Sequence, residues 1–210
     1  ALGNLNNASE KVVEALLSRL HDKSEMVVTY AAVALGNLSN ASEKVVAVLL
    51  SRLHDESKSV RFLVISALSN LSNVSEKVVA ALLFQLHDES EIVRTSTTQA
   101  LGNLSNASEK VIEALLSQLH DETEMLVTYT INRALGNFGN ASEKVVKALL
   151  SQLHDDNERV RNSATNALIK LGKNSSNVVA TIAQWISQNQ NSKYVGEAID
   201  LLWNLVVIEI

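Results

Sequence analysis

ALGNLSNASEKVIEALLSQLHDETEMLV, residues 100–127, recurs through the chain. Four close copies begin at Ala1, Ala34, Ala67 and Ala134, and a worn copy begins at Ala167, so successive copies are 33 residues apart except for one interval of 34. Periods of roughly 20–50 residues are typical of stacked supersecondary units. The sequence therefore predicts a tandem array in which each repeat packs only on its neighbours.

The composition is that of a folded, water-soluble protein and excludes several functions. Hydrophobic residues make up 46% of the 210 positions and charged residues 20%. A net charge of −5 argues against nucleic-acid binding, which needs a basic surface. No cysteine is present, so disulfides and thiolate zinc sites are excluded. The most apolar run, residues 201–208, is too short to span a bilayer. We expect a cytoplasmic protein, and the non-Met start within a repeat suggests a piece of a longer chain.

Each repeat reads as two helices joined by a polar turn. An Asn-x-x-Glu pattern, as at Asn40 and Glu43, predicts that Asn caps the first helix while Glu bonds back. The same pair occurs at Asn7/Glu10, Asn73/Glu76, Asn106/Glu109 and Asn140/Glu143. The second helix is predicted from apolar residues at helical spacing, which in the first repeat are Val27, Ala31, Ala34, Leu35 and Leu38. The fourth repeat has one extra residue, which we place near residues 131–133.

The chain resembles HEAT-like repeats of the phycobilisome-lyase type in its two-helix plan, in the Ala-Leu-Gly-x-Leu sequence that ends each repeat and in an Asp-x5-Arg spacing. Engineered alpha-helical repeat binders are similar in plan. The resemblance implies an all-α, right-handed α-solenoid. It also implies a ladder in which a turn aspartate bonds an arginine of the second helix. Asp55/Arg61, Asp88/Arg94 and Asp155/Arg161 fit this pattern, whereas Val28 and Val127 stand at the arginine position of repeats one and four. We divide the chain into five repeats, 1–166, and a divergent C-terminal capping repeat, 167–210.

No pattern in the sequence points to chemistry. The five histidines, at positions 21, 54, 87, 120 and 154, occupy one place per repeat. Packed helices lie about 8–10 Å apart, too far for neighbouring repeats to share one zinc ion with nitrogen ligands near 2 Å. The Asn-x-Ser sequences are explained by capping, although glycosylation stays an alternative. We predict no metal, no cofactor and no enzymatic activity.

The repeats differ most at the start of the second helix, where the changed positions share one face. That face includes large apolar residues, which unconstrained drift would not favour and which mark interaction sites when they cluster. Drift combined with packing remains the alternative. The residues predicted to contact a partner are Met26, Thr29, Tyr30, Val33, Ser59, Phe62, Leu63, Ser66, Ile92, Thr95, Ser96, Gln99, Met125, Thr128, Tyr129, Arg159, Asn162, Ser163 and Asn166.

These observations favour a non-enzymatic module that binds a protein or peptide on the second helices, with Phe62 and Leu63 at the centre. We expect a monomer that binds neither nucleic acid nor membrane, although end-to-end stacking into a structural rod stays open. Two further roles also stay open, a sensor or autoinhibitory segment of a larger signalling ATPase and a bilin-holding protein. A bilin site would need aromatic walls, and aromatic residues make up only 4% of the chain.

Overall fold

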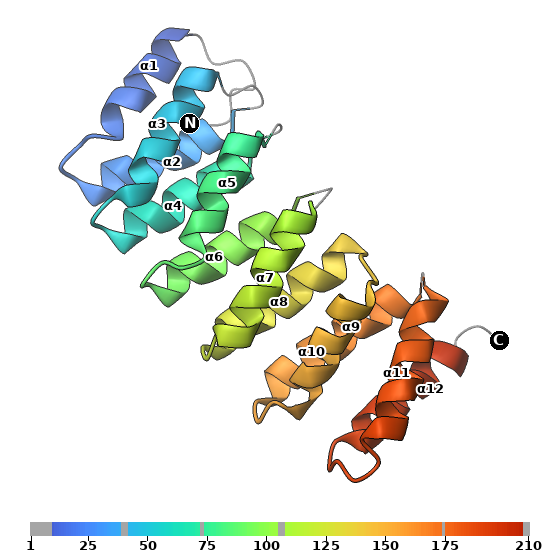
Figure 1. Ribbon diagram of the computed structural model, residues 1–210. Coiled ribbons are helices and arrows are strands. Elements are labelled where there is room, and N and C mark those ends of the chain that lie inside the picture. Colours follow the sequence, from blue (N-terminus) through green and yellow to red (C-terminus); the bar gives the residue numbers. More distant parts are fainter. Residues whose placement is uncertain (1–9, 39–41, 72–73, 105–107, 174, 208–210) are drawn as a thin grey trace. The chain divides into compact units, whose positions relative to one another are not determined.

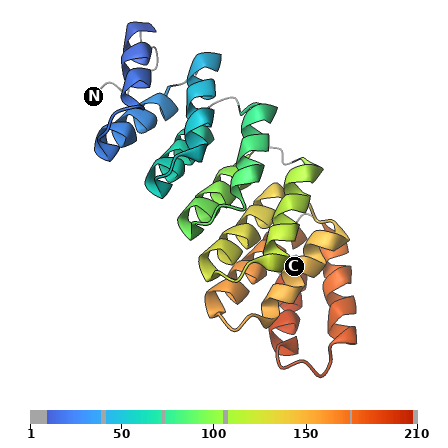
Figure 2. The same ribbon diagram turned by 60° about the vertical axis from the view of Figure 1, so that its left-hand side comes forward.

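The computed structural model describes residues 10–38, 42–71, 74–104, 108–173 and 175–207, which form helices joined by short turns and contain no strand (Figures 1 and 2). The first helices of the six repeats are α1 (Glu10–Arg19), α3 (Glu43–Ser51), α5 (Glu76–Gln85), α7 (Glu109–Asp121), α9 (Glu143–Ser151) and α11 (Ser176–Gln188). The second helices are α2 (Glu25–Gly36), α4 (Lys58–Ser69), α6 (Glu91–Gly102), α8 (Met125–Phe138), α10 (Glu158–Gly172) and α12 (Val195–Val207). Two first helices continue as 3₁₀ turns, η2 (Arg52–His54) and η3 (Gln152–His154). The predicted all-α array of helix pairs is confirmed.

The chain folds as two compact units, Ala1–Leu104 and Ser105–Ile210, called here the N-terminal and C-terminal units. Each unit holds three helix pairs arranged in two layers (Figure 1). In the N-terminal unit α4 packs between α2 and α6, and α3 contacts both α1 and α5. In the C-terminal unit α10 packs against α8 and α12, and α9 contacts α11. Second helices thus form one continuous layer within each unit.

The core lies between the two layers and consists mainly of leucine and valine. Leu35 and Leu68 of the second helices and Leu49 and Leu82 of the first helices are at most 1% exposed. The predicted stripe on α2 is partly confirmed, since Ala31, Leu35 and Leu38 are buried whereas Val27 and Ala34 are half-buried. Val28, next to the stripe, is buried instead.

Neighbouring second helices approach each other closely at a glycine. A Cβ atom built on Gly36 of α2 would lie 2.6 Å from the Cα of Ala67 in α4 and 2.9 Å from the Ala67 carbonyl oxygen. A Cβ atom built on Gly136 of α8 would likewise lie 2.9 Å from the Cα of Ala167 in α10. The Ala-Leu-Gly close of the repeat therefore supplies a contact between helix backbones that any larger side chain would prevent.

Serine, and not asparagine, is the N-cap of the first helices α3, α5, α7 and α9. Ser42, Ser75, Ser108 and Ser142 have extended backbones directly before the helix, and the Ser42 hydroxyl accepts a hydrogen bond from the Val45 amide. Asn140 acts two residues earlier, where its Oδ1 accepts from the Ser142 amide at 2.9 Å. The other predicted capping asparagines, Asn7, Asn40, Asn73 and Asn106, lie outside the described residues. The first helix thus begins at the glutamate of Asn-x-x-Glu.

An acidic side chain closes the turn between the two helices in each of the first five repeats. Its carboxylate accepts a hydrogen bond from the backbone amide two residues later, at 2.7–3.0 Å. The carboxylates belong to Asp22, Asp55, Asp88, Glu122 and Asp155. That amide belongs to the residue that precedes the second helix, so the bond fixes where the second helix starts.

Replacing Asp155 with alanine should therefore cost about 1 kcal/mol of folding free energy, the typical value of a lost helix cap. Asp155→Asn should cost less than half as much, because an amide oxygen can accept the same bond from Asn157. Urea denaturation followed by circular dichroism measures both. Equal losses for the two variants would mean that the negative charge, and not the hydrogen bond, stabilises the turn.

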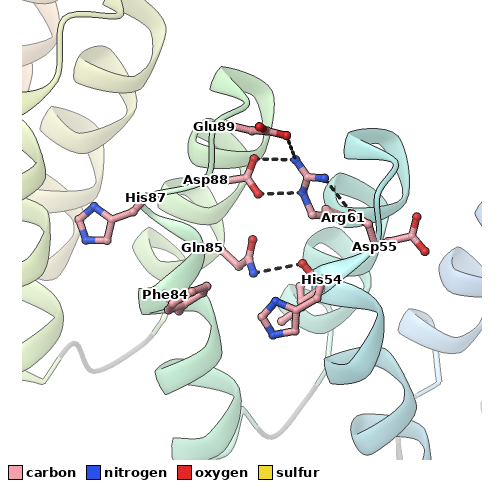
Figure 3. Close-up of a pocket in the computed structure, with 9 residues that line it drawn as sticks. His54, Asp55, Arg61, Phe84, Gln85, His87, Asp88 and Glu89 are labelled. Atoms are coloured by element: carbon pink, nitrogen blue, oxygen red, sulfur yellow. Dashed lines mark hydrogen bonds and ion pairs between the residues drawn. The ribbon is translucent and has the colours of Figure 1, made fainter.

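The predicted arginine ladder exists in a different form. Arg61, Arg94 and Arg161 donate through Nη1 to backbone carbonyl oxygens of their own turn, at 2.7–3.2 Å. The turn aspartate six residues earlier contributes its carbonyl oxygen and not its carboxylate. Arg61 pairs instead with the carboxylate of Asp88 in the next repeat, through Nε and Nη2 at 2.8 Å each. The ion pair thus connects two neighbouring repeats (Figure 3), and the Nη1 hydrogen bonds of Arg61 stabilise the turn of its own repeat.

The extra residue of the fourth repeat lies in its turn, not near residues 131–133. Helix α7 runs through His120 to Asp121, and Glu122 takes the place of the turn aspartate. Helix α8 then begins at Met125, five residues after His120, whereas α2 begins four residues after His21. The arginine position of this repeat is therefore Thr128, six residues after Glu122, and not Val127.

Candidate interaction surface

The predicted face is exposed on α2, at one edge of the second-helix layer in the N-terminal unit. Met26, Tyr30 and Val33 are 67%, 69% and 43% exposed. Thr29 is half-buried, and its hydroxyl donates to the carbonyl oxygen of Glu25. Three large side chains, at i, i+4 and i+7, thus form a largely exposed strip along one helix.

The predicted centre of the face, on α4, is less exposed than expected. Phe62 and Leu63 are half-buried, as is Ser66, while Ser59 is exposed. Phe62 follows the buried Arg61 and lies one turn before the buried Ile65, so it sits at the margin of the packed side. The sequence placed Phe62 on the outer face, but helix geometry brings it towards the neighbouring helices.

A hydrogen bond ties α2 to the start of α4 beside this face. The Ser57 hydroxyl donates to the Glu25 carboxylate at 2.7 Å. Bonds from the hydroxyls of Ser57 and Ser59 hold the pKa of Glu25 below its ordinary value. Ser59, one of the predicted contact residues, is thus engaged with Glu25 on the neighbouring helix.

Helix α6 completes the face of the N-terminal unit. Ile92 is 49% exposed and Gln99 is exposed, while Thr95 and Ser96 are half-buried. The apolar character of the face is therefore strongest on α2, falls on α4 and returns at Ile92.

The C-terminal unit carries the predicted residues in a shifted register. Thr128 is buried and Met125 and Tyr129 are half-buried, because the extra turn residue rotates α8 by one position. Leu126, which aligns with Val27 when the extra residue is placed near residues 131–133, is 44% exposed. Arg133 lies over the Tyr129 ring at 5.7 Å from its centroid.

On α10 the predicted polar residues divide into two groups. Arg159, Asn162 and Asn166 are exposed. Ser163 is 3% exposed, and its hydroxyl accepts from the amide nitrogen of the buried Asn132 at 3.0 Å. Ser163 therefore connects α8 and α10 and lies off the surface.

Exposed apolar residues also lie on α12, outside the face predicted from the sequence. Ile199 and Trp203 are 50% and 68% exposed, and Val206 and Val207 are also exposed. Every large exposed hydrophobic residue of the described chain except Phe84 lies on a second helix. Leu201 and Leu205 lie one turn apart and mark the buried side of α12, so the opposite side could have been predicted as the exposed face.

The histidines do not come together. Among the described residues no group of three His, Cys, Asp or Glu side chains lies close enough to hold a metal ion. His54 instead contacts the ring of Phe84 edge-on at 5.8 Å, and His154 lies 5.2 Å from the rings of both Trp185 and Tyr194. These two histidines thus pack on aromatic residues of the following repeat. No described helix is long and apolar enough to cross a membrane.

A family model for HEAT repeats matches residues 1–69, 46–136 and 112–203. The chain belongs to the HEAT repeat family. This HEAT repeat chain keeps the family pattern through the divergent last pair, since the match extends to residue 203. No curated protein sequence matches the chain.

Solved structures share the HEAT repeat fold at low identity. The complex of CpcE and CpcF of phycocyanin lyase from Nostoc matches with a TM-score of 0.63 and 18% identity, over 92% of this chain and 94% of that chain. Yeast importin-beta has a TM-score of 0.63 and 15% identity, over 96% of this chain and 31% of its own. A designed armadillo repeat protein in complex with the peptide (KR)4 has a TM-score of 0.54 and 20% identity, over 81% and 90%. At these identities the likeness establishes the fold alone.

Proposed function

We propose that this HEAT repeat chain is a non-enzymatic module that binds a protein or peptide on the exposed face of its second helices. The observation that carries the proposal is the strip of Met26, Tyr30 and Val33 on α2. Exposed apolar side chains that cluster on one face usually mark an interaction site. Burying them against a partner is favourable in proportion to the apolar area removed from water.

The arrangement of the layer supports a binding role. Second helices lie side by side in each unit, so exposed side chains from consecutive repeats form rows that an extended partner could follow (Figure 2). A designed armadillo repeat protein of similar fold is in complex with a peptide, and such designs serve modular peptide recognition. We include in the proposal that residues 1–166 form the binding repeats and residues 167–210 a terminal repeat.

Within the N-terminal unit, Tyr30 takes the central role that the sequence assigned to Phe62. Aromatic residues near the middle of an interface tend to contribute most of its binding energy. Tyr30 is exposed and lies between Met26 and Val33 on the helix surface, whereas Phe62 is half-buried. The remaining predicted residues of α4 and α6 would surround this strip as weaker contacts.

A peptide-display library selected on the full chain, followed by calorimetry, tests the proposal. Tyr30→Asp should weaken binding of the selected peptides by about 2 kcal/mol, or roughly 30-fold, because a charge would replace an aromatic ring inside the interface. The thermal unfolding midpoint should stay unchanged, since Tyr30 is 69% exposed.

The matched control is Lys44→Ser on a first helix, which removes an exposed residue on the other layer and should leave the affinity unchanged. Selected peptides that bind Tyr30→Asp as well as the original chain would place the binding surface elsewhere. A library that yields no binder at all would argue against peptide recognition.

A further inference from the structure

Helix α12 carries most of the exposed apolar surface described in the C-terminal unit. Ile199, Trp203, Val206 and Val207 are 50%, 68%, 49% and 39% exposed and are together called here the α12 patch. The first three follow at i, i+4 and i+7 and therefore share one side of the helix. Helix α12 packs against α10 and α11 at the end of the unit (Figure 1), and these two helices leave the patch largely exposed.

The patch occupies the side of α12 that in earlier repeats faces the next second helix. Each buried residue of α12 lies 34 positions after a buried residue of α10, in the pairs Ala164 and Ala198, Ala167 and Leu201, and Leu171 and Leu205. In this register the patch corresponds to a set on α10 made of Thr165, Ile169 and Gly172. A Cβ atom built on Gly172 would lie 2.6 Å from a side-chain carbon of Leu205 in α12, so this side of α10 faces the following helix.

Wherever a second helix follows in the same unit, the residue that corresponds to Ile199 is withdrawn from solvent. At the 33–34-residue spacing of the repeats these residues are Ala32, Ile65 and Asn132, which are 0% exposed, and Thr165, which is half-buried. The outermost repeat of an array normally presents a polar face, because an apolar face lowers solubility. An apolar patch in this place therefore indicates that another surface covers it.

Trp203 excludes a cover that stacks as α4 stacks on α2. At the repeat spacing its position is that of Gly36 in α2 and Gly136 in α8. At those glycines a single added Cβ atom would lie 2.6 Å and 2.9 Å from the Cα of the alanine opposite. Ile169 already replaces the glycine in α10 and is half-buried there, and an indole ring needs still more space. The covering surface must therefore have a depression opposite Trp203.

Helix α12 itself carries such a depression, at Gly196. This glycine is exposed, and a Cβ atom added to it would meet no atom within 4 Å. Gly196, Ile199 and Trp203 lie at i, i+3 and i+7 and so share the side of the patch. When two α12 helices cross in antiparallel directions at Ile199, the Trp203 ring of each lies over Gly196 of the other. The patch is thus complementary to itself, as a two-fold interface requires.

We propose that two copies of this chain pair through their α12 patches about a two-fold axis close to Ile199. The patch exposes about 400 Å² in each copy, the size of surface patches that mark interaction sites. Pairing buries roughly 800 Å² in total, below the ~1,200 Å² of standard stable complexes. The dimer is therefore weak, with a dissociation constant on the order of 100 µM, and dilute solutions contain the monomer expected from the sequence. The α2 strip takes no part in the pairing, which goes beyond the function proposed for that strip.

Charge beside the patch makes the pairing depend on salt. Asp200 is the exposed carboxylate of α12 and follows Ile199 at the flank of the patch. The two copies of Asp200 lie near the two-fold axis and repel each other, whereas Glu197 lies on the opposite side of the helix and pairs with Arg161 at 3.3 Å. Salt screens repulsion between exposed charges. The dimer should therefore be stronger at high salt than at low salt.

Sedimentation equilibrium of the full chain between about 5 µM and 1 mM tests the pairing, because this range brackets the expected dissociation constant. The weight-average mass should rise from the 22.8 kDa of one chain towards that of two chains and not beyond it. Raising NaCl from about 0.05 M to about 0.5 M should lower the dissociation constant at least twofold.

Two variants test the contact between Trp203 and Gly196, and a third is the control. Trp203→Gln should weaken the pairing at least tenfold. Gly196→Leu fills the space that Trp203 of the other copy needs and should weaken it at least fivefold. The unfolding midpoint of the dilute Gly196→Leu monomer should not fall, since the added Cβ meets nothing in its own chain. Phe84→Ser removes an aromatic side chain that is also 68% exposed but lies in the N-terminal unit, and it should leave the pairing unchanged.

A cysteine introduced at the axis gives an independent measurement, because the chain has none of its own. Ile199→Cys should form a disulfide between two copies under mild oxidation, since the axis brings the two side chains together. Asn204→Cys is the control, because Asn204 is exposed on the same helix but lies off the patch. This variant should cross-link at least tenfold more slowly.

Four results would overturn the proposal. A mass that stays at 22.8 kDa up to about 1 mM would mean that the chain does not pair in this range. A mass that grows beyond two chains would mean open-ended stacking in place of a two-fold dimer. Pairing that survives both Trp203→Gln and Gly196→Leu would place the contact elsewhere, as would equal cross-linking rates for the two cysteine variants.

Discussion

Arg61→Leu is expected to lower the free energy of unfolding by about 3–5 kcal/mol, the usual cost of removing one partner of a buried ion pair. The side chains of Arg61 and Asp88 are each 8% exposed, and two hydrogen bonds of 2.8 Å join them. Without the guanidinium, the Asp88 carboxylate loses its ion-pair partner and keeps the hydrogen bond from the Ser90 amide of its own turn. The carbonyl oxygens of Asp55 and Glu56 also lose a donor.

The matched control is the exposed pair of Lys44 and Glu14, which joins neighbouring first helices. Its side chains are 64% and 56% exposed, and Lys44→Ser should cost at most about 1 kcal/mol. Urea denaturation at low and high salt compares the two. Adding Asp88→Asn to Arg61→Leu should recover part of the loss, since a neutral amide keeps the bond from Ser90. A loss for Arg61→Leu no greater than that for Lys44→Ser would show that the repeats do not depend on this pair.

Gly36→Val is expected to cost about 3 kcal/mol, at the upper end of the range for an overfilled interior. The new Cβ would meet the backbone of Ala67, with 2.6 Å to its Cα, and a backbone cannot rotate away as a side chain can. The helix propensity of a residue larger than glycine would offset at most about 1 kcal/mol of this cost. The helices α2 and α4 must therefore move apart, and thermal unfolding should report the loss.

Gly196→Ala provides the control for Gly36→Val. Gly196 also lies in a second helix, but no atom stands within 4 Å of its added Cβ. This substitution should raise stability by up to about 1 kcal/mol through helix propensity alone. If Gly36→Val had the same thermal unfolding midpoint as the unaltered chain, the distance between the two helices could adapt to a larger residue. The close approach would then not be a fixed feature of the repeat.

Periodicity was sufficient to predict the helix pairs, because apolar residues such as Ala31, Leu35 and Leu38 follow helical spacing inside a repeat that recurs every 33–34 residues. Counting alone could not place the extra residue of repeat four. Aligning the repeats shows only that one residue is inserted between His120 and Ala134. The position of that residue depends on Glu122 replacing Asp121 as the hydrogen-bond acceptor of the turn. The capping error has a similar origin, since Asn140 and Ser142 both suit a cap and only backbone geometry separates them.

The candidate surface was predicted in outline, because a helical face follows from residue spacing. The sequence does not reveal how closely a neighbouring helix approaches each flank of that face. Phe62 and Thr29 lie on such a flank and are half-buried, whereas Tyr30 lies opposite the core and is exposed.

The hydrogen bonds that join one repeat to the next connect residues close in sequence, from 27 positions apart for Arg61 and Asp88 to 38 for His154 and Ser192. Proteins whose contacts are this local tend to fold quickly, and repeat arrays can nucleate at more than one place. A nascent chain on the ribosome can thus pair its early helices before the later ones are synthesised. Each repeat can pack as soon as the next few dozen residues have emerged from the ribosome. Little apolar surface is therefore exposed to aggregation during synthesis.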